Sequence, residues 1–298
     1  MTNDQSTWSP VREPVWTAGK GLSTLVEIVV FTDNQSETAS ILEFAGLLAD
    51  ENGARLISVF IQPALAYTPQ ESFAVGAGMI REVIEVHQSQ IESIEGRHRA
   101  LFDDVVRRHG ISAAEWRSLP HWGSEVAVHA YYADLVVIGS PGHTDQTALA
   151  ESLVLSSGRP IILFPPSATA SRVHRIVVAW NAARESIRAV ADALPLLSRA
   201  EAVEILIVDH QHQGRRHGEE PGVDIALHLA HHGVRVEVQR LSSGGQDMGH
   251  FLLSQAAAFG ADLLVMGAYG QSKLHEWIFG GITRTVLYEA ELPVLMSR

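Results

Sequence analysis

The sequence repeats itself, and the repeat constrains the fold more than any other feature. ADLVVIGSPG at residues 133–142 returns as ADLLVMGAYG at 261–270. EIVVFTDNQSETASILEFAGLL, from Glu27, resembles RIVVAWNAARESIRAVADALPLL, from Arg175, and RPIILFPP resembles LPVLMSR. Because the three pairs keep their order, the 298 residues consist of two copies of one unit, which predicts two domains of ordinary size.

Composition marks the limits of the two copies. Residues 165–175, PPSATASRVHR, are rich in proline and small polar residues, which is typical of a boundary. We therefore expect an N-terminal tail at 1–22, a first domain at 23–168 and a second domain at 172–298. The tail has no apolar segment of the kind found in secretory signals.

Each copy alternates short β-branched runs with helical patterns. Runs such as IVVF, ILIV and LLVMG lack polar residues, which indicates strands that are covered on both faces. This alternation predicts the α/β class, with two tandem doubly wound domains, each a five-stranded parallel sheet flanked by helices. Ligands on such sheets bind at the carboxyl ends of the strands, where the strand order reverses.

The repeat also places the individual elements. The predicted strands are 26–32, 55–61, 113–119, 134–139, 160–164, 174–180, 202–208, 234–240, 262–267 and 293–297. The predicted helices are 36–51, 79–109, 123–132, 146–156, 183–198, 222–232, 247–259 and 277–289.

Composition excludes several classes of function. The chain has no cysteine, which removes disulfides, thiolate nucleophiles and cysteine-ligated metals and favours a cytoplasmic location. Its formal net charge of −12 and its scattered basic residues argue against a nucleic-acid partner. No apolar run approaches the roughly 20 residues that cross a membrane, so we expect no membrane partner.

The residues suited to chemistry follow the fourth strand of each copy. In the second copy, Gly267-Ala-Tyr-Gly270 is followed by nine residues and then by Gly280-Gly281-Ile282-Thr283, which opens a helix. Glycine lets the backbone approach a ligand closely, and the free N–H groups of a helix N-terminus favour an anion such as phosphate. The same glycines also suit tight strand-to-helix turns without any ligand, and the residues alone leave both interpretations open.

In both halves of the chain this pattern resembles the universal stress protein family. The resemblance rests on GxxG, nine residues and a further Gly, placed between an ADLLVMG strand and a PVL strand. It implies the strand order 3-2-1-4-5 in each domain and a site for ATP, ADP or AMP, with no metal required. In nucleotide-binding members an Asp after the first strand and a residue ending the second contact the adenosine, and the Gly motif with a Ser or Thr holds the phosphates.

The resemblance implies a binding site in the second domain, with two departures. The implied residues are Ala179, Asn181, Val208, Met266, Gly267, Gly270, Gly280, Gly281 and Ile282. Asn181 stands where the family has Asp, and Gly281 stands where it has Ser or Thr, so a hydroxyl contact is lost. We expect a weakened or altered site.

The first domain departs from the pattern in a complementary way. It keeps Asp33, Gly139 and Gly142, but Ser152 stands where the later glycine is expected. We therefore expect this domain to have lost triphosphate binding.

Three other patterns favour structural roles. SGGQD at 243–247 resembles a pyrophosphate loop of adenylating enzymes but follows the wrong strand, which favours a loop with Asp247 as a helix cap. His228 and His232 have the spacing of zinc ligands, but no third ligand is marked. The amphipathic stretch 80–109 predicts a long helix that packs on its own domain.

No catalytic set emerges from the sequence, and Lys273 and His275 are merely loop residues between the glycine pairs. We expect a cytoplasmic stress-response binding or regulatory module whose second domain binds an adenine nucleotide. A weak ATP hydrolase is one alternative, and a non-binding pseudo-dimer that acts through protein–protein interaction is another. The family commonly forms dimers through its last strand, so we expect Pro160–Phe164 and Pro293–Met296 to pair within the chain, and a homodimer stays open.

Overall fold

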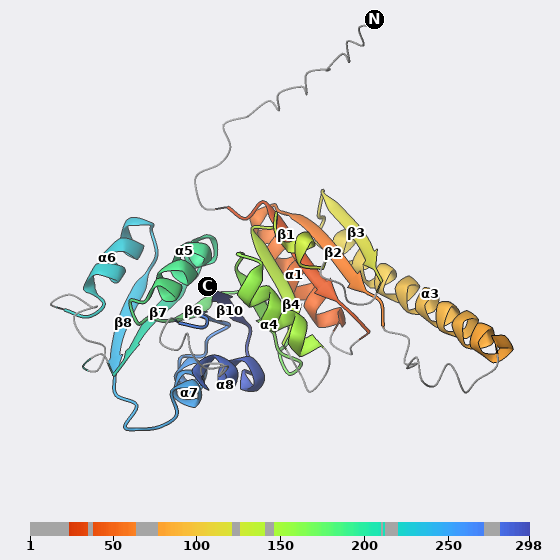
Figure 1. The fold of residues 1–298 in the computed structure, drawn as a ribbon. Coiled ribbons are helices and arrows are strands. Elements are labelled where there is room, and N and C mark those ends of the chain that lie inside the picture. Colours follow the sequence, from red (N-terminus) through yellow and green to blue (C-terminus); the bar gives the residue numbers. More distant parts are fainter. Residues whose placement is uncertain are drawn as a thin grey trace, which may run out of the picture.

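A computed structural model describes residues 24–34, 38–63, 77–120, 126–140, 146–209, 211, 220–270 and 281–298. Within these residues one continuous sheet runs through the molecule, in the order β3-β2-β1-β4-β5-β10-β9-β6-β7-β8 (Figure 1). Its strands are β1 (Glu27–Thr32), β2 (Arg55–Ile61), β3 (Ala114–Leu119), β4 (Leu135–Gly139), β5 (Ile161–Phe164), β6 (Arg175–Ala179), β7 (Ala202–Val208), β8 (Val236–Leu241), β9 (Leu263–Gly267) and β10 (Val294–Ser297). Its helices are α1 (Thr38–Asn52), α3 (Ala77–Arg108), η1 (Val126–Ala130), α4 (Gln146–Ser156), α5 (Arg184–Leu197), α6 (Val223–His231), α7 (Met248–Phe259) and α8 (Gly281–Glu289).

The first half (β1 to β5) and the second half (β6 to β10) have the same topology. Each contains five parallel strands, and when the strands are counted within each half the order is 3-2-1-4-5. The strand order that the family resemblance implied is therefore confirmed in both halves.

The apolar strands place side chains on both faces of the sheet. Along β1, Ile28 and Val30 face one apolar cluster, whereas Val29 and Phe31 face the other, because successive side chains of a strand alternate. Helices α1, α3, α5 and α6 contribute to the first cluster, and α4, η1, α7 and α8 contribute to the second. Both faces are thus covered, as the unbroken apolar runs predicted.

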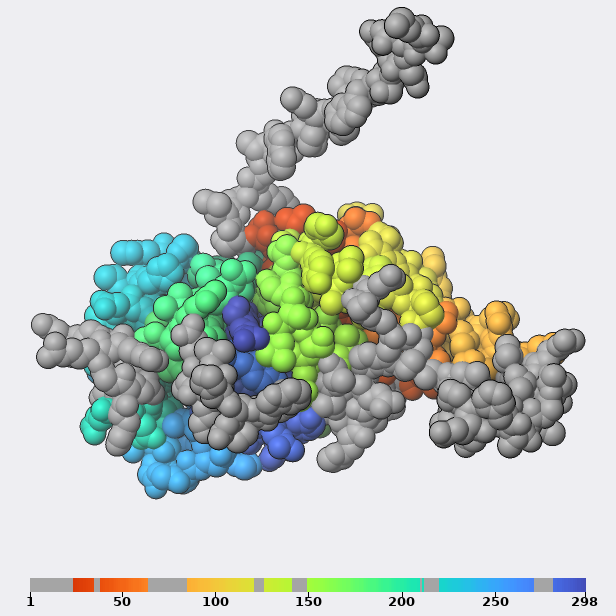
Figure 2. Space-filling view, in the orientation of Figure 1, coloured from red at the N-terminus to blue at the C-terminus, as the bar shows by residue number. Residues whose placement is uncertain are grey.

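The two halves join through their last strands. β5 and β10 pair antiparallel, with Leu163 opposite Val294 and Ile161 opposite Met296, so the predicted pairing within one chain is confirmed. The space-filling view shows the green residues of the first half packed directly against the blue C-terminal residues of the second (Figure 2). This junction is continuous with the sheet.

One predicted helix differs from the observed structure. Of the helix expected at 123–132, the described residues from Val126 onward form only the short 3₁₀ helix η1, whose five residues include the β-branched Val126 and Val128. Branching at Cβ lowers helix propensity, and 3₁₀ geometry suits short segments of this kind. The helix expected at 277–289 is described from Gly281 onward.

The long helix α3 packs on the first half through its C-terminal part. His98, Phe102 and Val105 are buried there, as the amphipathic pattern predicted. The opposite end of α3 extends past the edge of the sheet (Figure 1). Among the described residues, no helix combines the length and the apolar character needed to cross a membrane.

Candidate functional site

The ends of β6 and β9 form the switch point of the second half. Ala179 at the end of β6 lies between Leu206 of β7 and Met266 of β9. The chain after β6 runs through α5 and α6 on one face of the sheet, and later through α7 and α8 on the other. In open α/β sheets this is the place where ligands bind.

Backbone strain concentrates at the same edge. In the described part of the chain, the non-glycine residues with positive φ are Ala182 (54°), Asp209 (50°) and Tyr269 (53°). They follow β6, β7 and β9 respectively, whose ends are adjacent in the sheet. Left-handed backbone costs a non-glycine residue about 1–2 kcal/mol, and such residues cluster at binding sites.

Asn181 follows β6 and is exposed, but half of its carboxamide is already engaged. Its Oδ1 accepts a hydrogen bond from the N–H of Ala183 at 3.0 Å, which closes the turn that leads into α5. Nδ2 makes no hydrogen bond with the residues that the structure describes. Asn181 can therefore offer a ligand donors, whereas the Asp expected from the family would offer acceptors.

Three of the predicted site residues share one apolar cluster. Val208 and Met266 are buried at the ends of β7 and β9, and Ala179 packs against the same cluster. The structure therefore brings together three apolar residues that the family resemblance placed in the binding site.

Gly267 has a packing role in addition to any ligand role. A Cβ atom at this position would lie 2.5 Å from the carbonyl carbon of Glu185 and 2.6 Å from the backbone nitrogen of Ser186. The end of β9 therefore touches the first turn of α5 backbone to backbone, which only glycine allows. At Gly270, in contrast, a Cβ would meet only the Glu185 carboxylate at 3.6 Å.

The first described residues of α8 are exposed. Gly281 and Ile282 are exposed, and a Cβ at Gly281 would have no neighbour within 4 Å among the described residues. The free N–H groups of this first turn can therefore reach an anion. Gly280 lies outside the described residues, as do Gly142, Lys273 and His275.

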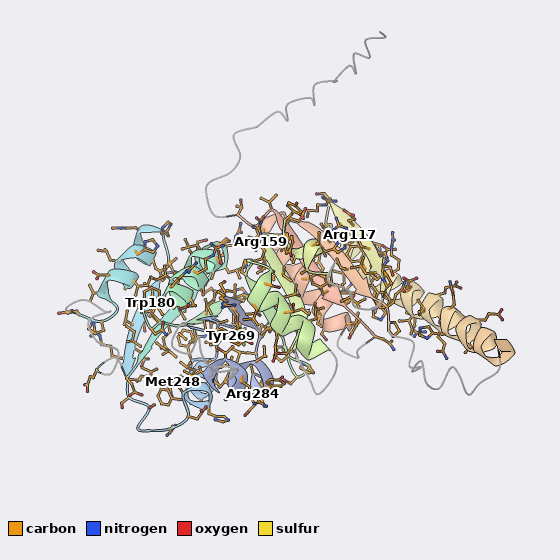
Figure 3. All side chains as sticks on the ribbon, in the orientation of Figure 1. Arg117, Arg159, Trp180, Met248, Tyr269 and Arg284 are labelled. Carbon is orange, nitrogen blue, oxygen red and sulfur yellow. The ribbon has the colours of Figure 1, made fainter. Side chains whose placement is uncertain are left out.

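The glycine turn and α8 are held together by Thr283. The backbone N–H of Tyr269 donates to Thr283 Oγ1 at 3.4 Å, and Thr283 is buried. The side chain of Tyr269 is directed to the junction of the two halves (Figure 3). Burial, together with the neighbouring Glu151 and Tyr288, raises the pKa of Tyr269 to about 12.

Other contacts across the junction surround this tyrosine. The hydroxyl of Tyr288 donates to Glu151 Oε1 at 3.3 Å, and the hydroxyl of Ser140 donates to the carbonyl of Leu287 at 3.2 Å. Helix α8 thus carries the candidate anion site at its N-terminus and contacts the first half near its C-terminus.

Asp209 lies at the edge of the candidate site, and the sequence patterns did not identify it. Its carboxylate accepts hydrogen bonds from the hydroxyls of Ser242 (2.9 Å) and Ser243 (2.5 Å) and from the N–H of Ser243 (3.1 Å). SGGQD at 243–247 therefore folds around Asp209 as a structural loop. At its end Asp247 accepts from the N–H of His250 at 3.1 Å, which confirms the predicted helix cap.

In the first half, helix α4 covers Gln146–Ser156 of the described residues. Ser152, which stands at the position of the later glycine, lies within α4. Asp33 follows β1 and is half-buried, and its carbonyl accepts a hydrogen bond from Thr38 Oγ1 at 3.0 Å.

The histidine pair with zinc spacing does not form part of a larger cluster. The rings of His228 and His232 lie 4.8 Å apart in an edge-to-face arrangement. In the described ranges no group of three or more His, Asp or Glu side chains is placed to hold a metal ion.

Comparison with known proteins agrees with the observed fold. Residues 172–298 match the Universal stress protein family. A solved universal stress protein from Archaeoglobus fulgidus superposes with a TM-score of 0.65 at 16% identity, covering 91% of this chain and 98% of that one. A Pseudomonas aeruginosa protein proposed to be a universal stress protein gives a TM-score of 0.58 at 13% identity, covering 92% and 94%. No curated protein matches the sequence significantly.

Proposed function

Because residues 172–298 belong to the universal stress protein family and the whole chain has the fold of solved members, we propose that this protein is a stress-response binding module whose second half binds an adenine nucleotide. The observation that carries the proposal is the edge formed by β6, β7 and β9. There an apolar cluster, an exposed carboxamide and an open helix N-terminus lie at one switch point.

Each part of this edge suits a different part of the ligand. The apolar side chains of Ala179, Val208 and Met266 suit an adenine ring, and Asn181 Nδ2 donates to an acceptor of the base or ribose. The backbone N–H groups from Gly270 and from Gly281 onward suit a phosphate. This arrangement binds an anion without a cationic side chain, in keeping with the net charge of −12.

The proposal includes ATP, ADP and AMP as ligands, no required metal, a cytoplasmic location and domains at 23–168 and 172–298. The proposed function is ligand binding rather than catalysis. Occupancy of the site then changes the surface that the protein presents to a partner. In this account the first half has lost the phosphate site, because Ser152, which lies within α4, stands where the later glycine is expected.

A non-binding pseudo-dimer is the second candidate, and a specific observation favours it. The packing of α5 already accounts for Gly267, and Tyr269 faces the junction of the two halves. If these residues serve only the junction between the two halves, the protein keeps the same fold without binding a nucleotide. It then acts through protein–protein interaction.

Two measurements on the purified full chain separate the candidates. Denaturing the protein and identifying the released small molecules tests for co-purified nucleotide, and calorimetry with ATP, ADP and AMP tests for added nucleotide. The proposal predicts a saturable signal for at least one adenine nucleotide. A blank in both measurements favours the pseudo-dimer.

A further inference from the structure

Glu185 is a buried acidic residue at the edge of the candidate site. It lies in the first turn of α5 and is only 7% exposed. It makes no hydrogen bond or ion pair with any residue that the structure describes. Carboxylates are rarely buried without a partner, because removing the charge from water is costly unless another group compensates.

The side chain runs along the glycine turn toward Gly270. Its Cβ would lie 2.7 Å from a Cβ at Gly267, and its Oε2 would lie 3.6 Å from a Cβ at Gly270. The carboxylate therefore sits beside the exposed backbone of Gly270, where the proposed function places the ligand. Because Gly270 has no side chain, no side-chain atom of residue 270 covers this carboxylate oxygen.

The charge of Glu185 changes what this turn can bind. A negative side chain in the first turn complements the dipole of α5, so the N-terminus of α5 already has an anion. A phosphate beside Gly270 would meet a like charge a few ångströms away, and each added phosphate increases the repulsion. A hydroxyl, in contrast, can donate a hydrogen bond to the carboxylate.

We propose that Glu185 determines specificity in the second half: it accepts a hydrogen bond from a neutral donor such as a ribose hydroxyl and disfavours polyphosphates. The preferred ligand class is then an adenine nucleoside carrying at most one phosphate. This inference rests on the proposed function and names the ligand within it.

Calorimetry with adenosine, AMP and ATP, without divalent cations, tests the inference on the wild-type chain. We expect AMP to bind at least about tenfold more tightly than ATP, because close like charges cost that much or more. In Glu185→Gln, which keeps the size of the side chain, we expect tighter ATP binding, weaker adenosine binding and an AMP-to-ATP ratio near one. Glu237→Gln, on the exposed surface of β8, is the matched control and should keep the wild-type ratio.

The outcomes are distinguishable. A wild-type preference for ATP, or an unchanged AMP-to-ATP ratio in Glu185→Gln, overturns the role of Glu185 and leaves nucleotide binding intact. Tight ATP binding that requires Mg²⁺ and is lost in Glu185→Gln also overturns it, because the carboxylate would then act through a cation. If none of the three ligands binds the wild-type chain or Glu185→Gln, the proposed function itself fails. The wild-type preference is measurable whether or not the variant folds.

Discussion

The backbone of Gly267 lies directly against the backbone of Glu185, so that even a methyl group at 267 would come within 2.5 Å of the Glu185 carbonyl carbon. This contact fixes β9 on α5 and sets the position of the turn that follows. Packing therefore explains Gly267, the first glycine of the motif. Evidence for a ligand has to come from the later residues of the motif.

Gly267→Ala is expected to destabilise the protein. The new methyl group must displace backbone atoms of Glu185 and Ser186, and overpacking of this kind costs about 1–3 kcal/mol. Gly270→Ala is the matched control, because its methyl group would meet only a side-chain oxygen at 3.6 Å. Urea unfolding of both variants measures the difference, and equal stabilities would contradict the close contact.

Ala183→Ser is expected to stabilise the protein. Ala183 is the N-cap of α5 and has the extended backbone of a cap (φ −83°, ψ 160°), but it has no side chain that can accept a hydrogen bond. A serine hydroxyl there can accept from a free N–H of the first turn, which is worth about 0.5–2 kcal/mol. Thermal unfolding measures the gain, and Ala183→Val should show none. A gain of the same size in Ala183→Val would rule out capping as its cause.

His98 is expected to make the protein less stable in acid. Burial, together with the charge of Arg97, lowers the pKa of His98 from 6.5 to about 4. Its ring packs on Phe60 with centroids 4.6 Å apart, and Nδ1 has no hydrogen-bond partner among the described residues. Below pH 6.5 the unfolded chain therefore takes up a proton that the folded chain does not, so stability falls as the pH drops toward 4.

The loss attributable to His98 is at most about 3 kcal/mol, since each pKa unit corresponds to about 1.4 kcal/mol. His98→Leu removes the titrating group, so its unfolding free energy should vary less between pH 7 and pH 4 than that of the wild type. Exposed His250 acts in the opposite direction, because its hydrogen bond with Glu289 raises its pKa, but it is present in both proteins. Parallel pH profiles for the two proteins would contradict the assignment.

The sequence was sufficient to predict most of the fold. Apolar runs such as that of β1 identified the strands. The family resemblance located the junction, and an edge strand's need for a partner gives the physical reason. The apolar pattern predicted a longer helix around η1. It did not reflect the low helix propensity of the β-branched Val126 and Val128.

The candidate site was less predictable, because its character depends on contacts between distant segments. Glu185 looked like an ordinary first-turn residue, and only the approach of β9 shows that it is buried beside the glycine turn. Tyr269 lies within the motif, but its orientation depends on α4 and α8. Asp209 did carry a signal, as a polar residue directly after β7 at the edge where ligands bind.

The central claim is that a nucleotide binds at the N-terminus of α8, and Gly281→Asp tests it most directly. A Cβ atom at 281 would have no described residue within 4 Å, and an acidic residue suits a helix N-terminus, so this variant should fold at least as stably as the wild type. Its charge would occupy the place of the phosphate. Gly96→Asp, at an equally open position on α3, is the matched control.

The deciding measurement is calorimetric titration of the wild type, Gly281→Asp and Gly96→Asp with AMP. The account predicts saturable binding to the wild type and to Gly96→Asp, and a loss of at least about tenfold in affinity for Gly281→Asp. Equal affinities for all three proteins would contradict it, because the phosphate would then lie away from α8.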